Sequence, residues 1–231
     1  MRKVIQICFG LALISLGLGL DKISLDVSLK KSPVGPETSP FYLNLDVKGT
    51  KTKLALALYT SYSFLASDAC NPVFVPYKCT EEKCKTDSSR NVSLITPYFS
   101  VNGNYWPVDI VLHNKMGKAL WQNYQGQNVI LAEQCKIGFN DKTVNGILGF
   151  GASYDAVKNF KSDIFSIYLN QNLTSGELIF GIDQDKFIKD SCQKYRSTGD
   201  WELPVRAVSI AGNNFNIQVT AIFDLYANSI I

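Results

Sequence analysis

Histidine is almost absent from this chain, whose 231 residues contain a single one, His113. Hydrolases with a serine or cysteine nucleophile need a histidine base, and zinc sites are usually built from several histidines and cysteines. His113 stands in a turn-like Leu-His-Asn stretch that is typical of a surface residue. The sequence therefore argues against serine- or cysteine-protease chemistry and against a metal site, and we expect no cofactor.

An excess of charge of one sign is also missing. The chain has 23 Lys and Arg against 20 Asp and Glu, a net charge of +3. Its basic residues form short clusters such as Lys30-Lys31 rather than a stripe. Because a nucleic acid would be bound through a basic patch or stripe, we expect no nucleic acid partner.

Long apolar runs are missing after the first twenty residues. Arg2 and Lys3 precede an apolar run from Val4 to Leu20. A charged start before such a run is typical of a signal peptide, predicted here as residues 1–20, and a membrane anchor is the alternative. With the signal removed, we expect no membrane association and a protein that is secreted or held in the lumen of the secretory or lysosomal pathway.

The cysteines agree with an oxidising compartment. Cys79 and Cys84 close a small loop, which favours a local disulfide over a zinc site. Cys8 lies in the predicted signal peptide, so the mature chain has an odd number of cysteines and at least one thiol is free or pairs with another chain. The sequence leaves open the pairing of Cys70, Cys135 and Cys192.

Two tripeptides are acceptor sites for N-linked glycans. They are Asn91-Val-Ser and Asn172-Leu-Thr. Both matter only if the chain enters the secretory pathway, in which case a glycoprotein is predicted.

Short β runs separated by Gly, Asn and Pro dominate the rest of the chain, after a predicted lead-in loop over residues 21–39. Helix signal is weak, and Ala152–Phe160 is the best candidate. The pattern predicts an all-β protein. The expected strands are Phe41–Val47, followed by a turn at Gly49-Thr50, then Lys53–Tyr59, Ser93–Tyr98, Trp106–Leu112, Val129–Leu131, Ile164–Leu169, Glu177–Gly181, Val205–Ile210 and Phe215–Phe223.

Four stretches, in order along the chain, resemble pepsin-like aspartic proteases. The most specific is Val144–Gly151, Val-Asn-Gly-Ile-Leu-Gly-Phe-Gly, which is similar to the family's Asp-Gly-Ile-Leu-Gly-Leu-Gly. Residues 164–183 resemble the family's segment that joins its two lobes. The Cys79/Cys84 loop and the hairpin from Pro40 to Thr50 complete the set.

The resemblance implies a bilobal acid-protease fold. Residues 40–163 are then a complete N-terminal lobe, and residues 164–231 are the interlobe strands and a partial C-terminal lobe. A lobe that is only partly present would expose apolar strands. We therefore expect either a partner that covers them or a sequence that is a fragment or an inaccurate gene product.

The family's chemistry needs two Asp-Thr-Gly loops whose carboxylates share a proton. The first loop aligns on Leu58–Leu65, where Thr60 and Ser63 match and are candidate substrate-binding residues. Tyr59 stands at the position of the first catalytic Asp, and Ser61 stands at the position of the Gly. A phenol, with an ordinary pKa of about 10, is no general base at acidic or neutral pH.

The second loop aligns on Ala221–Ala227. Asp224 keeps the second catalytic carboxylate, while Leu225 and Tyr226 replace Thr and Gly. Tyr98 falls at the family's flap tyrosine, a substrate-binding position, and the resemblance places the flap hairpin at Phe99–Trp106, with Gly103-Asn104 at its turn.

We therefore expect an inactive aspartic-protease homologue that binds a peptide or protein in its cleft. The alternative is an active aspartic endopeptidase completed by a partner or by dimerisation through Asp224. A third possibility is a secreted structural or inhibitory protein that uses the fold as a scaffold.

Overall fold

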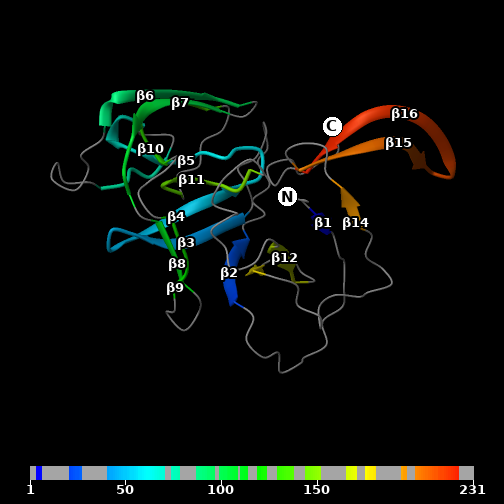
Figure 1. Ribbon diagram of the computed structural model, residues 1–231, viewed down its shortest axis with the longest axis horizontal. Helices are drawn as coiled ribbons and strands as arrows, with labels where there is room; N and C mark the ends of the chain where they lie inside the picture. The colour runs from blue at the N-terminus through cyan, green and yellow to red at the C-terminus, as the bar shows by residue number, and fades with distance from the viewer. Residues whose placement is uncertain are drawn as a thin grey trace.

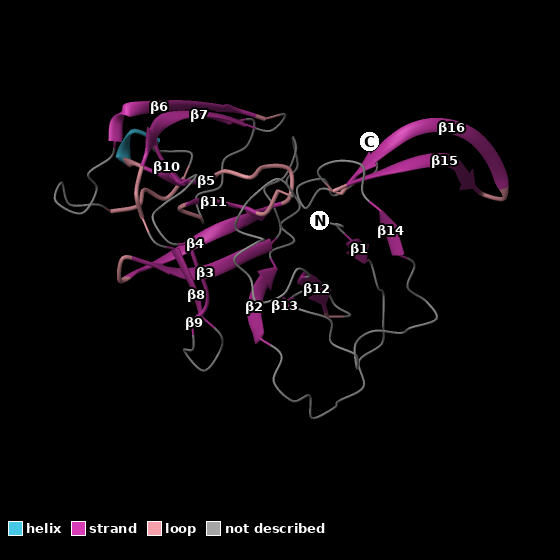
Figure 2. Ribbon diagram, viewed as in Figure 1, coloured by secondary structure: helices cyan, strands magenta, loops and turns pink. Residues whose placement is uncertain are grey.

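The structure is a computed structural model, and most of the residues that it describes lie in β-strands. The residues it describes are 4–6, 21–27, 41–70, 74–78, 87–96, 99–108, 110–113, 119–123, 129–137, 144–151, 165–170, 175–180, 194–196 and 201–223. Over these residues Figure 2 shows strands and a single short helical turn, η1 (Asp68–Cys70). The prediction of an all-β fold is confirmed. The candidate helix at Ala152–Phe160 lies outside the described residues.

Twelve of the described strands form one mixed sheet, in the order β12-β13-β2-β3-β4-β11-β5-β10-β7-β6, with β8 paired to β3 and β9 paired to β8 (Figure 1). The strands of the chain are β1 (Val4–Gln6), β2 (Asp21–Val27), β3 (Phe41–Val47), β4 (Thr50–Ala57), β5 (Ser63–Ala66), β6 (Asp87–Ile95), β7 (Phe99–Tyr105), β8 (Ile110–His113), β9 (Ala119–Asn123), β10 (Val129–Ile137), β11 (Gly146–Gly149), β12 (Phe165–Leu169), β13 (Ser175–Phe180), β14 (Lys194–Arg196), β15 (Glu202–Ile210) and β16 (Asn213–Ile222).

A two-residue turn joins β3 to β4. Its central residues are Lys48 and Gly49, with φ of 48° and 79°. Positive φ at both positions is the type I′ geometry that matches the twist of a hairpin. The Asp46 carboxylate accepts a hydrogen bond from the Gly49 amide at 2.6 Å. The turn therefore lies one residue earlier than the predicted Gly49-Thr50, because Thr50 already pairs with Val47.

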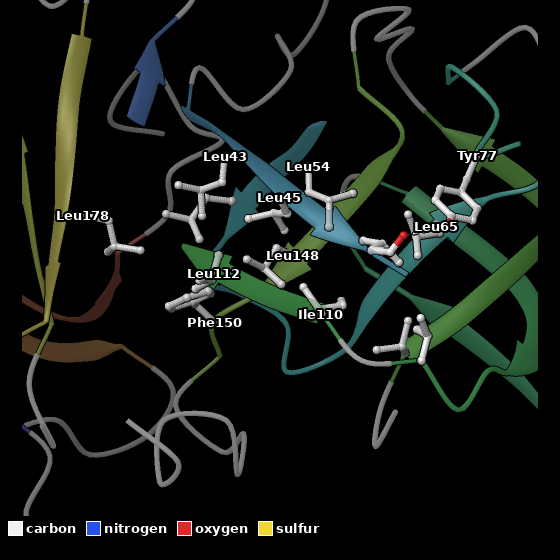
Figure 3. Close-up of a cluster of buried hydrophobic side chains, with 14 of the residues drawn as sticks. Leu43, Leu45, Leu54, Leu65, Tyr77, Ile110, Leu112, Leu148, Phe150 and Leu178 are labelled. Carbon is white, nitrogen blue, oxygen red and sulfur yellow. Dashed lines mark hydrogen bonds between the residues drawn. The ribbon is translucent and has the colours of Figure 1, made fainter. Parts of the chain in front are cut away.

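Alternate residues of β4 fill two separate cores, one on each face of the sheet. Leu54 and Leu56 belong to the larger cluster. Figure 3 shows Leu54 of this cluster together with Leu43 and Leu148 from other strands and Phe150, which follows β11. The alanines between them, Ala55 and Ala57, face the second cluster. Side chains of a strand point alternately to its two faces, so the second half of β4, which is buried on both sides, carries no polar residue.

Strand β11 lies between β4 and β5, although it follows them by some eighty residues. It runs parallel to β4 and antiparallel to β5. Asn145 anchors its entry, because the Asn145 side chain accepts a hydrogen bond from the Lys53 amide at 3.0 Å and donates one to the Val75 carbonyl at 3.1 Å. Gly146 follows with its Cα against the Phe64 main chain, where a Cβ would overlap the Phe64 carbonyl. The inserted strand forces the chain between β4 and β5 to pass over the end of β11.

Residues 21–27, predicted as part of a lead-in loop, form β2 instead. This strand pairs with β13 over Asp21–Asp26 and with β3 at Asp26 and Val27. The pairing continues the main sheet from β3 to β13, and local sequence does not reveal such a long-range partner. The Pro- and Gly-containing stretch 32–39 lies outside the described residues.

The hairpin β15–β16 forms a separate two-stranded sheet at the right of Figure 1. Trp201 attaches its base to the main sheet: the indole Nε1 donates to the Phe150 carbonyl at 2.8 Å, and the ring packs edge-on against Phe165 at 5.1 Å. A third sheet pairs β1, which lies within the predicted signal peptide, with β14.

No helix in the described part of the chain has the length and apolar character needed to cross a membrane.

The predicted flap hairpin at Phe99–Trp106 is not a hairpin in the structure. Phe99–Tyr105 is one continuous strand, β7, and its hairpin partner is β6. Gly103 lies in mid-strand against β10, where a Cβ would overlap the Leu131 carbonyl, so this glycine serves close backbone packing and not a turn. Strand β6 ends at Ile95 and β7 begins at Phe99. The Thr96 amide and hydroxyl both donate to the Phe99 carbonyl, and the Phe99 amide donates to the Thr96 hydroxyl.

Candidate functional site

The loop from Leu58 to Tyr62 connects the adjacent ends of β4 and β5 over the end of β11. Residues at that end of β11 hold the loop at three points. The Phe150 amide donates to the Ala57 carbonyl and the Gly151 amide donates to the Thr60 carbonyl, both at 2.7 Å. The Gly149 amide donates to the Ser63 hydroxyl at 3.0 Å. The loop is therefore fixed at its start, its middle and its end.

Two glycines make this contact possible. A Cβ on Gly149 would overlap the carbonyl oxygens of Tyr62 and Thr60. A Cβ on Gly151 would lie 2.6 Å from the Thr60 carbonyl carbon and 2.7 Å from the Ser61 amide nitrogen. Because real side chains do not come this close, the Gly-Phe-Gly spacing that we singled out in the sequence is explained by a backbone packed directly against the loop.

The hydroxyls of Thr60 and Ser63 both bind main-chain amides. Thr60 is 5% exposed, and its Oγ1 accepts a hydrogen bond from the Tyr62 amide at 3.1 Å. Ser63 is 1% exposed and accepts from Gly149. This geometry gives both residues a role in shaping the loop. Their predicted contact with a substrate stays a prediction.

Tyr59 points to the same face of the sheet as Ala57 and Ala55, two and four positions earlier. Its ring packs against the second cluster and lies 6.0 Å from the ring of Phe99, centroid to centroid. Its hydroxyl oxygen is shielded from solvent. The position expected to hold the first catalytic carboxylate is thus occupied by an aromatic ring that is part of a packed core.

Ser61 fits its position without backbone strain. The loop 58–62 contains no residue with positive φ. The glycine that the resemblance implies at position 61 is therefore not required by backbone conformation in this chain, where Ser61 is half-buried next to Gly151.

Tyr62 in the loop and Tyr105 at the end of β7 form a pair of neighbouring phenols, 6.5 Å apart between ring centroids. Burial raises the pKa of Tyr105, and the hydrogen bond and proximity to Tyr62 raise it further, while the Arg90 guanidinium opposes the rise. The guanidinium carbon of Arg90 lies 4.4 Å from the centre of the Tyr105 ring. Tyr105 stays neutral at acidic and neutral pH, so the pair offers hydroxyl donors and acceptors beside the loop. Sequence reasoning missed this pair because no local pattern links residues 62, 90 and 105.

Several predicted site residues lie outside the described part of the chain. They are the second-loop Asp224, the flap residue Tyr98, the glycosylation residue Asn172, and the cysteines Cys79, Cys84 and Cys192. Their roles stay predictions. Among the described residues no group of three His, Cys, Asp or Glu side chains is placed to hold a metal ion.

The structure shows one of the cysteine pairings that the sequence left open. Cys70, at the end of η1, forms a disulfide with Cys135 on β10, with Cα atoms 5.2 Å apart. Cys70 is buried at 2% exposure. The bond ties the segment that follows β5 to the neighbouring strand β10.

Comparisons with known proteins agree with this geometry. Residues 122–230 match the sequence model of the eukaryotic aspartyl protease family. Among solved structures, the crystal structure of an aspartic proteinase from Irpex lacteus matches with a TM-score of 0.57 and 15% identity. That match covers 89% of this chain and 62% of the Irpex lacteus chain, so the chain spans less than two thirds of the fungal protein. No curated protein sequence matches significantly.

Proposed function

This chain belongs to the pepsin-like aspartic protease family, and on that premise we propose that it is a secreted homologue that no longer cleaves peptide bonds and instead binds a peptide or protein segment. The observation that carries the proposal is the position of Tyr59. The loop between β4 and β5 is where the resemblance places the first catalytic carboxylate, and residues 58–63 contain no acidic side chain.

The chemistry explains why one missing carboxylate matters. In the family's reaction one carboxylate removes a proton from the attacking water while its protonated partner polarises the scissile carbonyl. One carboxyl group cannot act as acid and base in the same step. Asp224 alone is therefore insufficient, and the Tyr59 phenol is uncharged in the acidic range where such enzymes work.

The packing of Tyr59 adds to this argument. The ring is partly buried and packs against the second cluster, which contains Phe99, the first residue of β7. A water molecule positioned for attack needs a polar pocket with hydrogen-bond partners on both sides. At position 59 the ring packs against Phe99, and its one hydroxyl is shielded from solvent, so the side chain provides no carboxylate to hold and activate such a water.

A binding role is supported by the polar rim beside this core. Tyr62 and Tyr105 carry hydroxyls that suit peptide amides, and tyrosines supply contact area with little loss of side-chain freedom. Secretion is supported by the apolar N-terminal run and by the Cys70–Cys135 disulfide, since disulfides persist mainly in oxidising compartments.

The first test is proteolysis. The purified chain is incubated with a denatured protein between about pH 3 and pH 7, with and without pepstatin, beside an active pepsin-like enzyme. We expect no pepstatin-sensitive cleavage. Cleavage that pepstatin blocks would overturn the proposal and favour an active endopeptidase in which Asp224 works with a carboxylate from a partner or a second copy.

The second test is binding. A library of unstructured peptides is screened by fluorescence anisotropy, and the best binder is measured against the Tyr62→Phe and Tyr105→Phe variants. Loss of one hydrogen bond weakens binding by about fivefold. The control, Tyr168→Phe on the distant strand β12, should leave affinity unchanged. A folded chain that binds no peptide would leave only the scaffold interpretation.

A further inference from the structure

Asn91 lies on the outermost strand of the main sheet with its side chain exposed. It begins the acceptor tripeptide Asn91-Val92-Ser93 on β6. Side chains two residues apart point to the same face of a strand. Asn91 and Ser93 are accordingly both exposed, while Val92 is half-buried against the second cluster. The folded structure thus accommodates a bulky group on Asn91 without moving any core residue.

Strand β6 is also an open edge. It ends the sheet order and, among the described strands, pairs only with β7 (Figure 1). An edge strand presents unpaired amide and carbonyl groups to which a strand of another molecule can add. Natural sheets protect such edges with bulges, charges, prolines or a cover.

The two halves of β6 differ in this respect. In the first half the register with β7 shifts between Asp87 and Asn91, and Arg90 is charged and exposed. In the second half, Asn91–Ile95 pairs regularly with Ser100–Asn104 and contains no charged residue. Ile95, at the end of this half, is 78% exposed.

The regular half lacks the features that discourage strand addition. It is uncharged and contains no proline, and Val92 and Ile95 favour β structure. Neither a bulge nor a charge protects it. The acceptor asparagine stands in this half, at its first position.

We propose that Asn91 carries an N-linked glycan that covers the unprotected half of the β6 edge and prevents strand addition by another chain. The proposal rests on the secreted location proposed above. Asn91 and Ile95 are about 13 Å apart along an extended strand, so a branched oligosaccharide on the first residue extends over the segment.

The modification is a transfer from a lipid diphosphate oligosaccharide. The bond from the sugar's anomeric carbon to the diphosphate oxygen breaks, and a bond from that carbon to Nδ2 of Asn91 forms. The amide nitrogen loses one proton, and the lipid diphosphate leaves with the electron pair of the broken bond. The Ser93 hydroxyl is required because the acceptor must have Ser or Thr two residues after the asparagine.

The site is tested by expressing the chain in eukaryotic cells behind a strong foreign signal sequence, so that entry into the lumen does not depend on residues 1–20. Peptide mass spectrometry before and after enzymatic deglycosylation should find glycan on Asn91. Asn91→Gln and Ser93→Ala should both lose it, and the matched control Ser93→Thr should keep it.

A glycan on the second acceptor, Asn172, shows that the chain has entered the lumen whether or not Asn91 is modified. Glycan on Asn172 with none on Asn91 would overturn the proposal while leaving secretion intact, and glycan on neither would overturn it as well. Expression with the native N-terminus tests secretion by itself, so failure of the proposed location and failure of the site are distinguishable.

The protective role has its own test. We expect glycosylated protein to remain monomeric in light scattering and Asn91→Gln to form oligomers under the same conditions. Adding Ile95→Lys to Asn91→Gln places a charge on the same edge and should restore the monomer. An Asn91→Gln variant that stays monomeric, or one that Ile95→Lys does not rescue, would overturn the role of the glycan at this edge.

Discussion

The ring of Tyr59 lies 6.0 Å from the ring of Phe99, centroid to centroid, with 59° between the ring planes. Phe99 in turn lies edge-on to Phe64 at 5.2 Å. The three rings come from the loop after β4, from β7 and from β5, so they connect the candidate loop to β5, which follows it, and to the more distant strand β7. A carboxylate at position 59 would break this aromatic contact and bring a charge against an apolar cluster.

Tyr59→Asp is therefore expected to destabilise the fold without restoring activity. Loss of the ring and burial of a charge should lower the free energy of unfolding by about 3 kcal/mol, measured by urea denaturation. Tyr59→Phe is the control, because it keeps the ring contact and should change stability by less than about 1 kcal/mol. Pepstatin-sensitive cleavage by Tyr59→Asp would show that the rest of the site is still competent.

Gly151→Ala should be among the most damaging conservative substitutions in the chain. The added methyl would lie against the main chain of Thr60 and Ser61, and the loop would have to move. We expect a loss of about 3 kcal/mol in the free energy of unfolding. Gly49→Ala is the matched control, because a Cβ added at Gly49 would have no atom within 4 Å. Only the positive φ of 79° disfavours alanine there, so we expect a loss of about 1 kcal/mol in the free energy of unfolding. Equal losses at the two glycines would contradict the packing argument.

Removal of the Cys70–Cys135 disulfide should lower stability substantially. The bond joins residues 65 positions apart, and in the chain-entropy picture closing such a loop contributes about 4 kcal/mol. The double variant Cys70→Ala/Cys135→Ala tests this by thermal or urea denaturation. Adding reductant should destabilise the native protein and leave the double variant unchanged, and any further effect on that variant would have to come from the remaining cysteines.

Asn145→Asp tests the amide that anchors β11. The Asn145 side chain accepts from the Lys53 amide and donates to the Val75 carbonyl. A carboxylate accepts only, so it would face the Val75 carbonyl without a proton to share. We expect a loss of about 1–2 kcal/mol at neutral pH. Part of it should return in acid, where a protonated Asp regains a donor; a variant as stable as the native protein at neutral pH would refute the assignment.

Alkaline pH should weaken the fold through Tyr77. Burial raises the pKa of its phenol above the ordinary value of 10.0, the hydrogen bond with Thr50 opposes the rise, and Asp46 adds to it. The hydroxyl donates to the Val47 carbonyl at 3.0 Å. Because the folded pKa is the higher one, this stabilisation is complete below about pH 10 and is lost as the pH rises through the folded value.

Tyr77→Phe is the variant that isolates this effect. It should be less stable than the native protein near neutral pH by about 1 kcal/mol, owing to the lost hydrogen bond. Its free energy of unfolding should fall less steeply above about pH 10. Parallel curves for the two proteins would show that Tyr77 does not contribute to the alkaline transition.

Local sequence predicted some strands closely and others wrongly: Trp106–Leu112 was expected as one strand, but β7 ends at Tyr105 and β8 begins at Ile110. Phe41–Val47 matches β3 at both ends, and the runs near residues 165–169 and 205–210 lie within one to three residues of β12 and β15. The flap turn was placed at Gly103-Asn104, but Gly103 is in mid-strand. A glycine signals either a turn or a close backbone approach, and only the neighbouring strand distinguishes the two.

By itself, the sequence determined that this is an all-β protein, through period-two alternation and closely spaced turn residues. It also supplied the resemblance that aligns Tyr59 with the first catalytic carboxylate, which stays a prediction. The tertiary structure decided what those residues do. Insertion of β11 between β4 and β5, pairing of β2 with β13, and the bond between Cys70 and Cys135 all join segments far apart in the chain. Such contacts depend on how the whole sheet closes around its two cores. The burial of Tyr59 against Phe99 and the exposure of Asn91 on an open edge follow from that arrangement and from no local pattern.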